Sequence, residues 1–129
     1  HALSYVLTSA YGIPHGQAVA LSLAQFLEIN ADYENRPLND PRGPSHLRGV
    51  FKSLFELFSV EGAAGFLERF RGLLTNIGLS TSLAELGVEG GAVGQKIAAN
   101  VNLERLKNNP VAITNTDIRQ VVHAMQGKR

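Results

Sequence analysis

The sequence predicts an all-α fold, a single bundle-like domain of about seven helices. Apolar side chains recur at spacings of three and four residues through most of the chain, the period of a helix with one buried face. Glycine, proline and asparagine, together with helix-capping serines and threonines, interrupt these segments at short intervals. No segment alternates apolar and polar residues convincingly, as a half-buried strand does.

Composition limits the classes of function open to the chain. Its 129 residues suit one domain, and its 44% hydrophobic content suffices for a buried core. The lack of cysteine excludes disulfides, thiolate metal sites and iron–sulfur clusters. The net charge is +1 and Lys128-Arg129 is the only basic cluster, which argues against a nucleic-acid partner. No apolar run approaches about 18 residues, so we expect no membrane partner either.

The first two helices are predicted over residues 1–10 and 15–29. Gly12-Ile13-Pro14 ends the first helix and folds the second back beside it, and Pro14 also suits the first turn of that second helix. Apolar side chains surround nearly all of the second helix, which predicts a central position. Residues 32–45 contain three prolines and are predicted to form a loop.

The middle of the chain contains two longer helices. Ser45 is expected to cap a helix over 46–58, and a second helix over 61–76 is expected to end at Gly78. Phenylalanines at helical spacing predict that these two helices pack against each other antiparallel: Phe51, Phe55, Phe58, Phe66 and Phe70.

Shorter elements complete the predicted fold. Ser82 and Glu85 have the spacing of a capping box at a short turn. A helix is predicted over 88–101, with its glycines near the start or at a close backbone approach. A short turn of helix over 102–107 and a last helix over 118–125 follow.

Two of the four histidines stand out as candidate metal ligands. His1 and His15 each lie at a helix start, on either side of the Gly-Ile-Pro turn, so their imidazoles can converge on one cation. A catalytic metal needs about three protein ligands, and no third is obvious nearby. The alternative is that His15 serves the helix start and His1 is incidental. His46 and His123 are expected to be solvated or capping residues.

Longer sequence patterns resemble a known family. Residues 1–8 read His-Ala-Leu-Ser-Tyr-Val-Leu-Thr, and Pro14-His15-Gly16 and a long apolar helix follow. Near the end, an Asn-Leu-Glu-Arg-Leu segment leads to Asn109-Pro110 and a final helix. These patterns resemble the C-terminal helical domain of the iron-containing (group III) alcohol dehydrogenases, which shares a dehydroquinate synthase-like plan. The tail and Tyr5 resemble the phosphonoacetaldehyde reductase branch.

The resemblance implies a two-domain enzyme of which residues 1–129 are the C-terminal helical part, which binds metal and substrate. An N-terminal α/β domain, absent here, would bind NAD(P), and a helix just upstream would supply two further metal ligands, an Asp and a His. By motif, His1 and His15 match two ligands of a divalent metal, iron or zinc. Tyr5 stands where the family often has a substrate-side histidine, so we expect a catalytic role at the substrate oxygen. The implied reaction interconverts a small alcohol and an aldehyde.

Other interpretations remain open at this stage. The chain could be a stand-alone helical interaction module without catalysis, or a domain of a dehydroquinate-synthase-like lyase. Because it opens with His1 and not Met, we expect it to be part of a longer polypeptide. We expect the 129 residues alone to be inactive and to bind metal weakly or not at all. We expect the intact protein to be cytoplasmic and to be able to form homo-oligomers.

Overall fold

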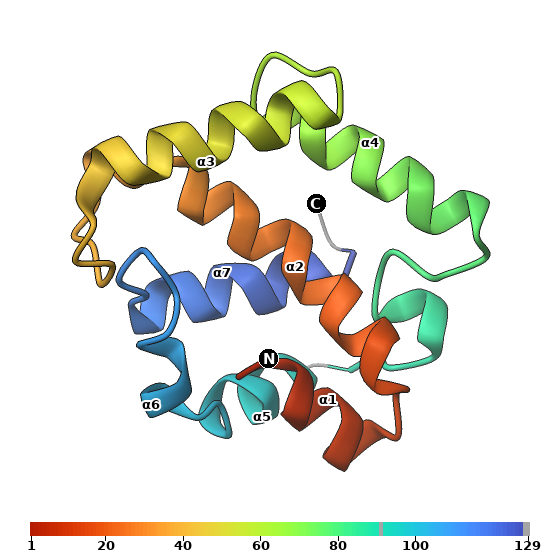
Figure 1. Ribbon diagram of the computed structural model, residues 1–129. Coiled ribbons are helices and arrows are strands. Elements are labelled where there is room, and N and C mark those ends of the chain that lie inside the picture. The colour runs from red at the N-terminus through yellow and green to blue at the C-terminus, as the bar shows by residue number, and fades with distance from the viewer. Residues whose placement is uncertain (91, 128–129) are drawn as a thin grey trace.

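The computed structural model describes residues 1–90 and 92–127, so Gly91 and the basic pair Lys128-Arg129 lie outside it. Over that part of the chain the fold is all-α, with no strand beyond an isolated bridge between Leu38 and Val111 (Figure 1). The predicted fold class is confirmed. The α-helices are α1 (Ser4–Tyr11), α2 (His15–Ala31), α3 (Gly43–Leu57), α4 (Ala63–Asn76), α5 (Val93–Ala99), α6 (Leu103–Leu106) and α7 (Asn115–Met125).

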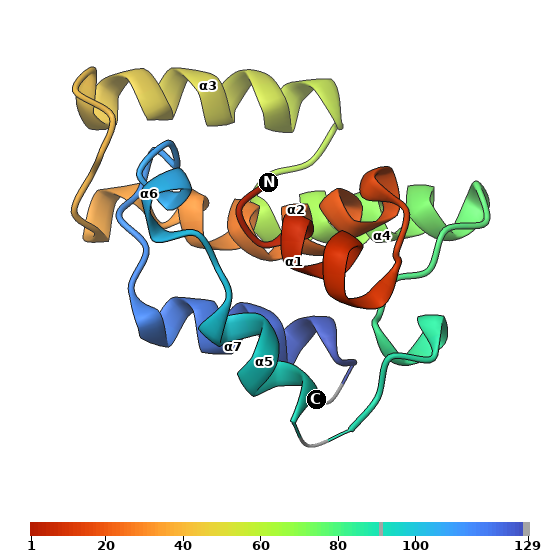
Figure 2. The ribbon, with the colours of Figure 1, turned by 90° about the horizontal axis from the view of Figure 1, so that it is seen from below.

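Helix α2 is the central element, as its apolar surface predicts. It packs against α1, α4 and α7, and α5 packs on α7. Seen from below, α3 forms one outer layer, α1, α2 and α4 lie in the middle, and α5 and α7 form the third layer (Figure 2). The core lies around the junction of α1, α2, α5 and α7. Its most completely buried side chains are Leu3, Leu7, Leu83, Ile97, Val111, Val122 and Met125.

A left-handed turn at Gly12 joins α1 to α2. Gly12 has φ of 66°, a conformation that glycine adopts without the steric penalty of a side chain. The N–H groups of Gly12 and Ile13 donate to the carbonyls of Thr8 and Leu7, at 3.0 and 3.4 Å. Ile13 is buried, which anchors the turn in the core. His15 therefore starts α2 at a fixed position relative to α1.

Helix α3 begins earlier than the sequence indicates. The predicted start at residue 46 with a Ser45 cap is wrong, because Gly43 and Pro44 already form the first turn of α3. Proline fits that turn, since its missing N–H would have no partner there. The predicted loop is correspondingly shorter and contains a 3₁₀ turn over Tyr33–Asn35.

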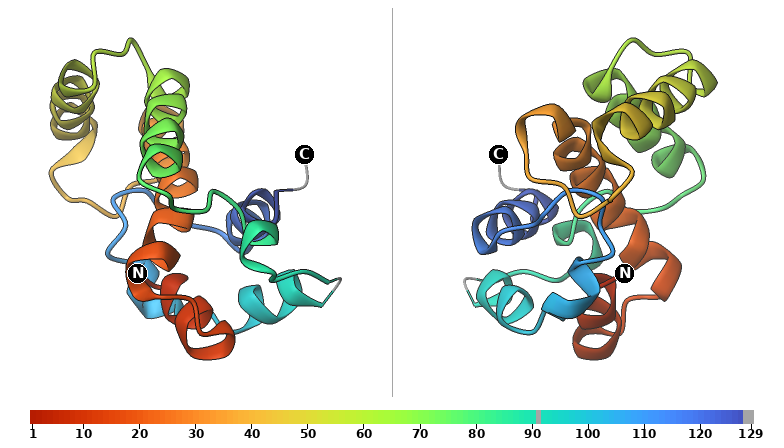
Figure 3. Two further views of the ribbon diagram at one scale, coloured as in Figure 1. Left: turned by 90° about the vertical axis from the view of Figure 1, so that its right-hand side faces the viewer. Right: turned by 60° about the vertical axis from the view of Figure 1, so that its left-hand side comes forward.

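The predicted antiparallel pairing of α3 with α4 is also wrong. Helix α3 packs mainly on the Tyr33–Asn35 turn, whereas α4 packs on α2. Phe51 stacks on Tyr33 with ring centres 5.6 Å apart, and the two helices meet only near their connection, where Phe58 contacts Phe66. Figure 3 (left) shows α3 and α7 on opposite sides of the α2 and α4 layer. The phenylalanines thus form four local aromatic contacts instead of one extended helix pair: Tyr33–Phe51, Phe51–Phe55, Phe58–Phe66 and Phe66–Phe70.

The remaining elements follow the predictions with shifted limits. Gly90 precedes α5 and has φ of 127°, and Gly91 lies outside the described residues. Gly94 lies in the first turn of α5, where an added Cβ would come within 3.4 Å of the Val122 and Gln126 side chains. Glu85 accepts from the backbone and hydroxyl of Thr81, one residue before the predicted partner, while Ser82 accepts from the Glu85 N–H. No helix in the described residues is long and apolar enough to cross a membrane.

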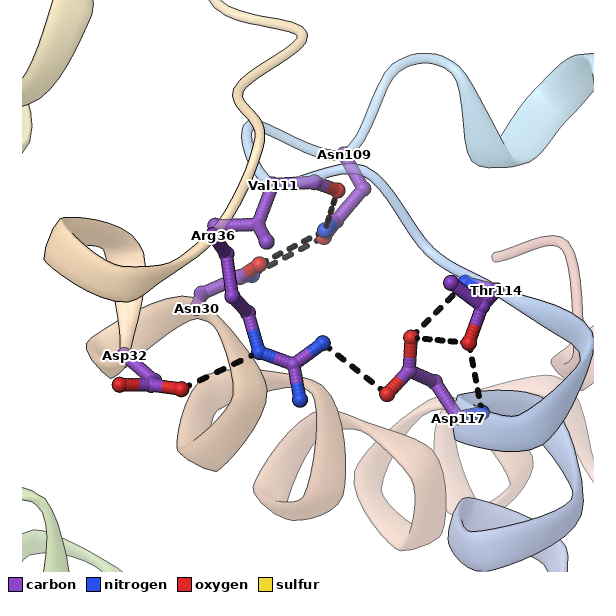
Figure 4. A network of polar contacts seen from close by, with 7 residues as sticks. All are labelled: Asn30, Asp32, Arg36, Asn109, Val111, Thr114 and Asp117. Carbon is purple, nitrogen blue, oxygen red and sulfur yellow. Dashed lines mark hydrogen bonds and ion pairs between the residues drawn. The ribbon is translucent and has the colours of Figure 1, made fainter.

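A polar network ties the segment after α2 to the start of α7 (Figure 4). Asp117 and Thr114 form a capping box, and Asp117 also pairs with Arg36 at 3.0 Å. Arg36 contacts Asp32 as well, at 3.3 Å. Burial raises the pKa of Asp117, but hydrogen bonds from Thr114 and Arg36 outweigh it and hold that pKa below its ordinary value.

The turn at Gly12 provides a test of its conformation. Replacing Gly12 with alanine should lower the free energy of unfolding by about 1 kcal/mol, because an L side chain disfavours positive φ. No neighbour lies within 4 Å of the added Cβ, so the effect is purely one of backbone conformation. Gly72→Ala, in open space on α4, should raise it by about 0.5–1 kcal/mol. Urea unfolding measures both, and a stabilised Gly12→Ala would contradict the assigned turn.

The Asp117 network predicts a pH dependence. Because the pKa of Asp117 is lower in the folded state, its contribution is complete above the unfolded value and is lost as pH falls below about 4. Asp117→Asn should destabilise by about 1–3 kcal/mol at neutral pH, and the difference from the wild type should shrink on acidification. Asp32 is the exposed partner of Arg36, so Asp32→Asn should lower the free energy of unfolding by less than Asp117→Asn does. A difference that stays constant down to pH 2 would refute this role.

Candidate functional site

The three residues predicted to act together do lie together. His1 precedes α1, Tyr5 lies in the first turn of α1, and His15 begins α2. The His1 and His15 rings are nearly parallel, with centres 5.3 Å apart. The Tyr5 ring centre lies 5.8 Å from that of His15 and 6.4 Å from that of His1. All three side chains are exposed, so another domain could reach them.

The neighbours of His1 hold it in place. The Ser4 hydroxyl donates to the His1 carbonyl at 2.9 Å, and the Tyr5 N–H donates to the same oxygen at 3.3 Å. Ser4 and the two residues between, Ala2 and Leu3, are buried. The first turn of α1 therefore fixes the backbone of His1 while its ring faces His15.

The ring geometry fits two imidazoles bound to one cation. With metal–nitrogen bonds of about 2.0–2.1 Å and tetrahedral angles, two ligating rings have centres roughly 5 Å apart. The separation of 5.3 Å agrees with that arrangement. No group of three or more His, Cys, Asp or Glu side chains suited to a metal occurs in the described residues. The described part of the chain can thus offer a pair of ligands, short of a complete set.

The other two histidines lie elsewhere. His46 is on α3 and His123 is on the exposed side of α7. Neither ring contacts the His1, Tyr5 and His15 cluster. His123 is exposed, as expected of a solvated residue, whereas His46 is half-buried in the first turn of α3.

A large groove opens beside the cluster. It has a volume of about 880 Å³ and runs between α2, α3 and the segment around α6. His1 and Tyr5 line its end, together with Arg105 and Asn108. Apolar side chains form most of its walls: Val19, Leu23, Phe26, Leu27, Leu47, Val50, Phe51, Leu54 and Leu106. Such a groove suits a small organic ligand held near the histidines.

The sequence did not predict the position of Arg105 beside the cluster. The chain after α5 folds back so that Arg105, on α6, lies over the Tyr5 ring, with its guanidinium carbon 4.4 Å from the ring centre. The only signal in the sequence is the Asn-Leu-Glu-Arg-Leu segment, which shows a family pattern but not which side chain faces the cluster.

Comparison with known proteins identifies the family. The model of the Fe-containing alcohol dehydrogenase family, C-terminal, matches residues 1–126. The chain belongs to the iron-containing alcohol dehydrogenase family. The resemblance seen in the sequence is thereby confirmed.

Two relatives within this family are informative. Phosphonoacetaldehyde reductase of Streptomyces viridochromogenes is 39% identical over 54 residues, which are 42% of this chain and 14% of that enzyme. Sulfoacetaldehyde reductase of Bifidobacterium kashiwanohense, solved in complex with NAD+, has a TM-score of 0.76 and 25% identity. That comparison covers all of this chain but 31% of the solved one. The chain therefore matches only a minor part of each relative.

Proposed function

We propose that this chain is the metal- and substrate-binding helical part of a nicotinamide-dependent enzyme that interconverts a small alcohol and an aldehyde. The observation that carries the proposal is the convergence of His1, Tyr5 and His15, of which His1 and Tyr5 line an apolar groove. Membership of the iron-containing alcohol dehydrogenase family and the likeness to a reductase solved with NAD+ support it.

His1 and His15 would hold a divalent metal, iron or zinc, through one imidazole nitrogen each. When bound, such an ion polarises a carbonyl or alcohol oxygen as a Lewis acid. Two further ligands, an Asp and a His, would come from a helix just upstream, and a preceding nucleotide-binding domain would bind the nicotinamide. The small share of the relatives that this chain spans supports that division.

Tyr5 is suited to act at the substrate oxygen. Its ring lies beside both histidines and lines the groove, and it is 46% exposed, so its hydroxyl can meet a bound substrate. In the direction of reduction, the hydride goes from the nicotinamide to the aldehyde carbon and a proton goes to the oxygen. The Tyr5 Oη would donate the hydrogen bond that stabilises this oxygen and would pass on its proton.

The substrate class that we propose is a short aldehyde with an anionic head group. The names of both relatives describe reductases of such aldehydes, one with a phosphonate and one with a sulfonate. The groove agrees with this class, because none of its lining residues is acidic and one of them is an arginine.

The histidine assignment is tested in the full-length enzyme. His15→Ala should remove the bound metal and lower turnover at least about a hundredfold, because even losing a group that merely orients a ligand costs up to that much. The circular dichroism should remain helical, since the side chain of His15 is exposed. His123→Ala, on the exposed side of α7, is the matched control and should keep both metal and activity. A His15→Ala enzyme with stoichiometric metal and near-normal turnover would overturn the assignment.

A further inference from the structure

We propose that Arg105 binds the anionic head group of the substrate and thereby determines which aldehydes the site accepts. This inference rests on the proposed function and adds to that function a residue that determines substrate specificity. Three features of the structure carry it: the fixed position of the side chain, its lack of a counter-charge, and its place relative to the histidines.

The backbone at Arg105 is well anchored. The Asn102 side chain caps α6 by accepting a hydrogen bond from the Arg105 N–H at 3.2 Å. The next residue, Leu106, is buried in the core. The guanidinium then stacks on the Tyr5 ring, and stacking of this kind stabilises an arginine without using any of its N–H donors.

Within the part of the chain that the structure describes, Arg105 has no ion-pair partner, and in this it resembles Arg69, Arg71 and Arg119. Arg36, Arg42 and Arg48 each form an ion pair with a carboxylate. Among the described residues, no carboxylate pairs with Arg105 and no acceptor takes a hydrogen bond from its side chain. The five N–H donors of its guanidinium are thus open to a ligand.

The groove provides the electrostatic setting. Arg105 lines it together with His1 and Tyr5, and no acidic side chain lines it. Phosphonate and sulfonate groups match the planar fork of a guanidinium and bind it through paired, charge-assisted hydrogen bonds. Such an anion would be attracted to the one arginine of an otherwise mostly apolar groove.

The distances suit a short substrate. The Tyr5 ring contacts the guanidinium of Arg105, and its centre lies 5.8 Å from the centre of the His15 ring. A compound with its aldehyde oxygen at the histidines and Tyr5 can therefore place a nearby anionic group on the guanidinium. A neutral aldehyde of equal length would use the same oxygen site but not Arg105.

The experiment compares Arg105→Ala and Arg105→Lys in the full-length, metal-loaded enzyme. The substrates are a short phosphonate aldehyde, the matching sulfonate aldehyde and a neutral aldehyde of equal length. Arg105→Ala should raise KM for an anionic substrate by about ten- to a hundredfold, with kcat changed by no more than about twofold. The neutral aldehyde should be unaffected. Arg105→Lys should restore part of the affinity, since it keeps the charge but not the fork.

Lys96→Ala is the matched control. Lys96 lines a neighbouring hollow that Arg105 shares, but it does not line the groove that contains His1. Its removal deletes one nearby positive charge and should leave all three KM values unchanged. If Arg105→Ala raised KM equally for the anionic and the neutral aldehydes, the proposal would be overturned, because Arg105 would then merely support Tyr5. The larger KM shift distinguishes phosphonate from sulfonate as the head group.

A binding measurement separates this inference from the proposed function. Methylphosphonate and methanesulfonate, titrated calorimetrically, should bind the wild-type enzyme, and Arg105→Ala should lose at least one of the two. If the enzyme reduces no aldehyde but still binds an anion through Arg105, the proposed reaction fails and the anion site stands. Anion binding that is the same in the wild type and Arg105→Ala would refute the role of Arg105.

Discussion

The turn between α1 and α2 is the constraint on which the candidate site depends. Gly12 reverses the chain in a left-handed conformation, Ile13 buries its side chain, and Pro14 is the N-cap residue of α2. One helical turn later, the side-chain amide of Gln17 forms two hydrogen bonds with the backbone of Ser80. Its Nε2 donates to the Ser80 carbonyl at 2.8 Å, and its Oε1 accepts from the Ser80 N–H at 3.1 Å. These contacts hold the start of α2 on both sides. They place the His15 ring next to the rings of His1 and Tyr5, although no hydrogen bond joins these three side chains.

A second set of contacts brings the distant end of the chain to the same place. Asn30 and Asn109 exchange side-chain hydrogen bonds, and the Asn39 N–H donates to the Pro110 carbonyl at 2.8 Å. Together with the Arg36–Asp117 pair, these contacts hold the segment after α6 against α2 (Figure 4). Because this segment follows α6 directly, the same polar contacts that close the fold also place Arg105 beside Tyr5.

Local sequence signals account for the parts of the structure that were predicted. Helical periodicity and the Gly12-Ile13-Pro14 break predict α1, α2 and the convergence of His1 with His15, since the turn and its flanking helices are contiguous in sequence. The packing partner of α3 was not predictable, because the phenylalanine spacing defines an apolar face of the helix but not the element that covers it. Arg105 was missed for a related reason: its contact with Tyr5 joins residues a hundred positions apart.

Anomalous X-ray scattering from crystals of the metal-loaded full-length protein tests the central claim most directly, namely that the α1–α2 turn builds half of a metal site. The account predicts one strong peak between the rings of His1 and His15, about 2.0–2.2 Å from one nitrogen of each. A fully occupied metal that touches only one of these histidines, or neither, would contradict it.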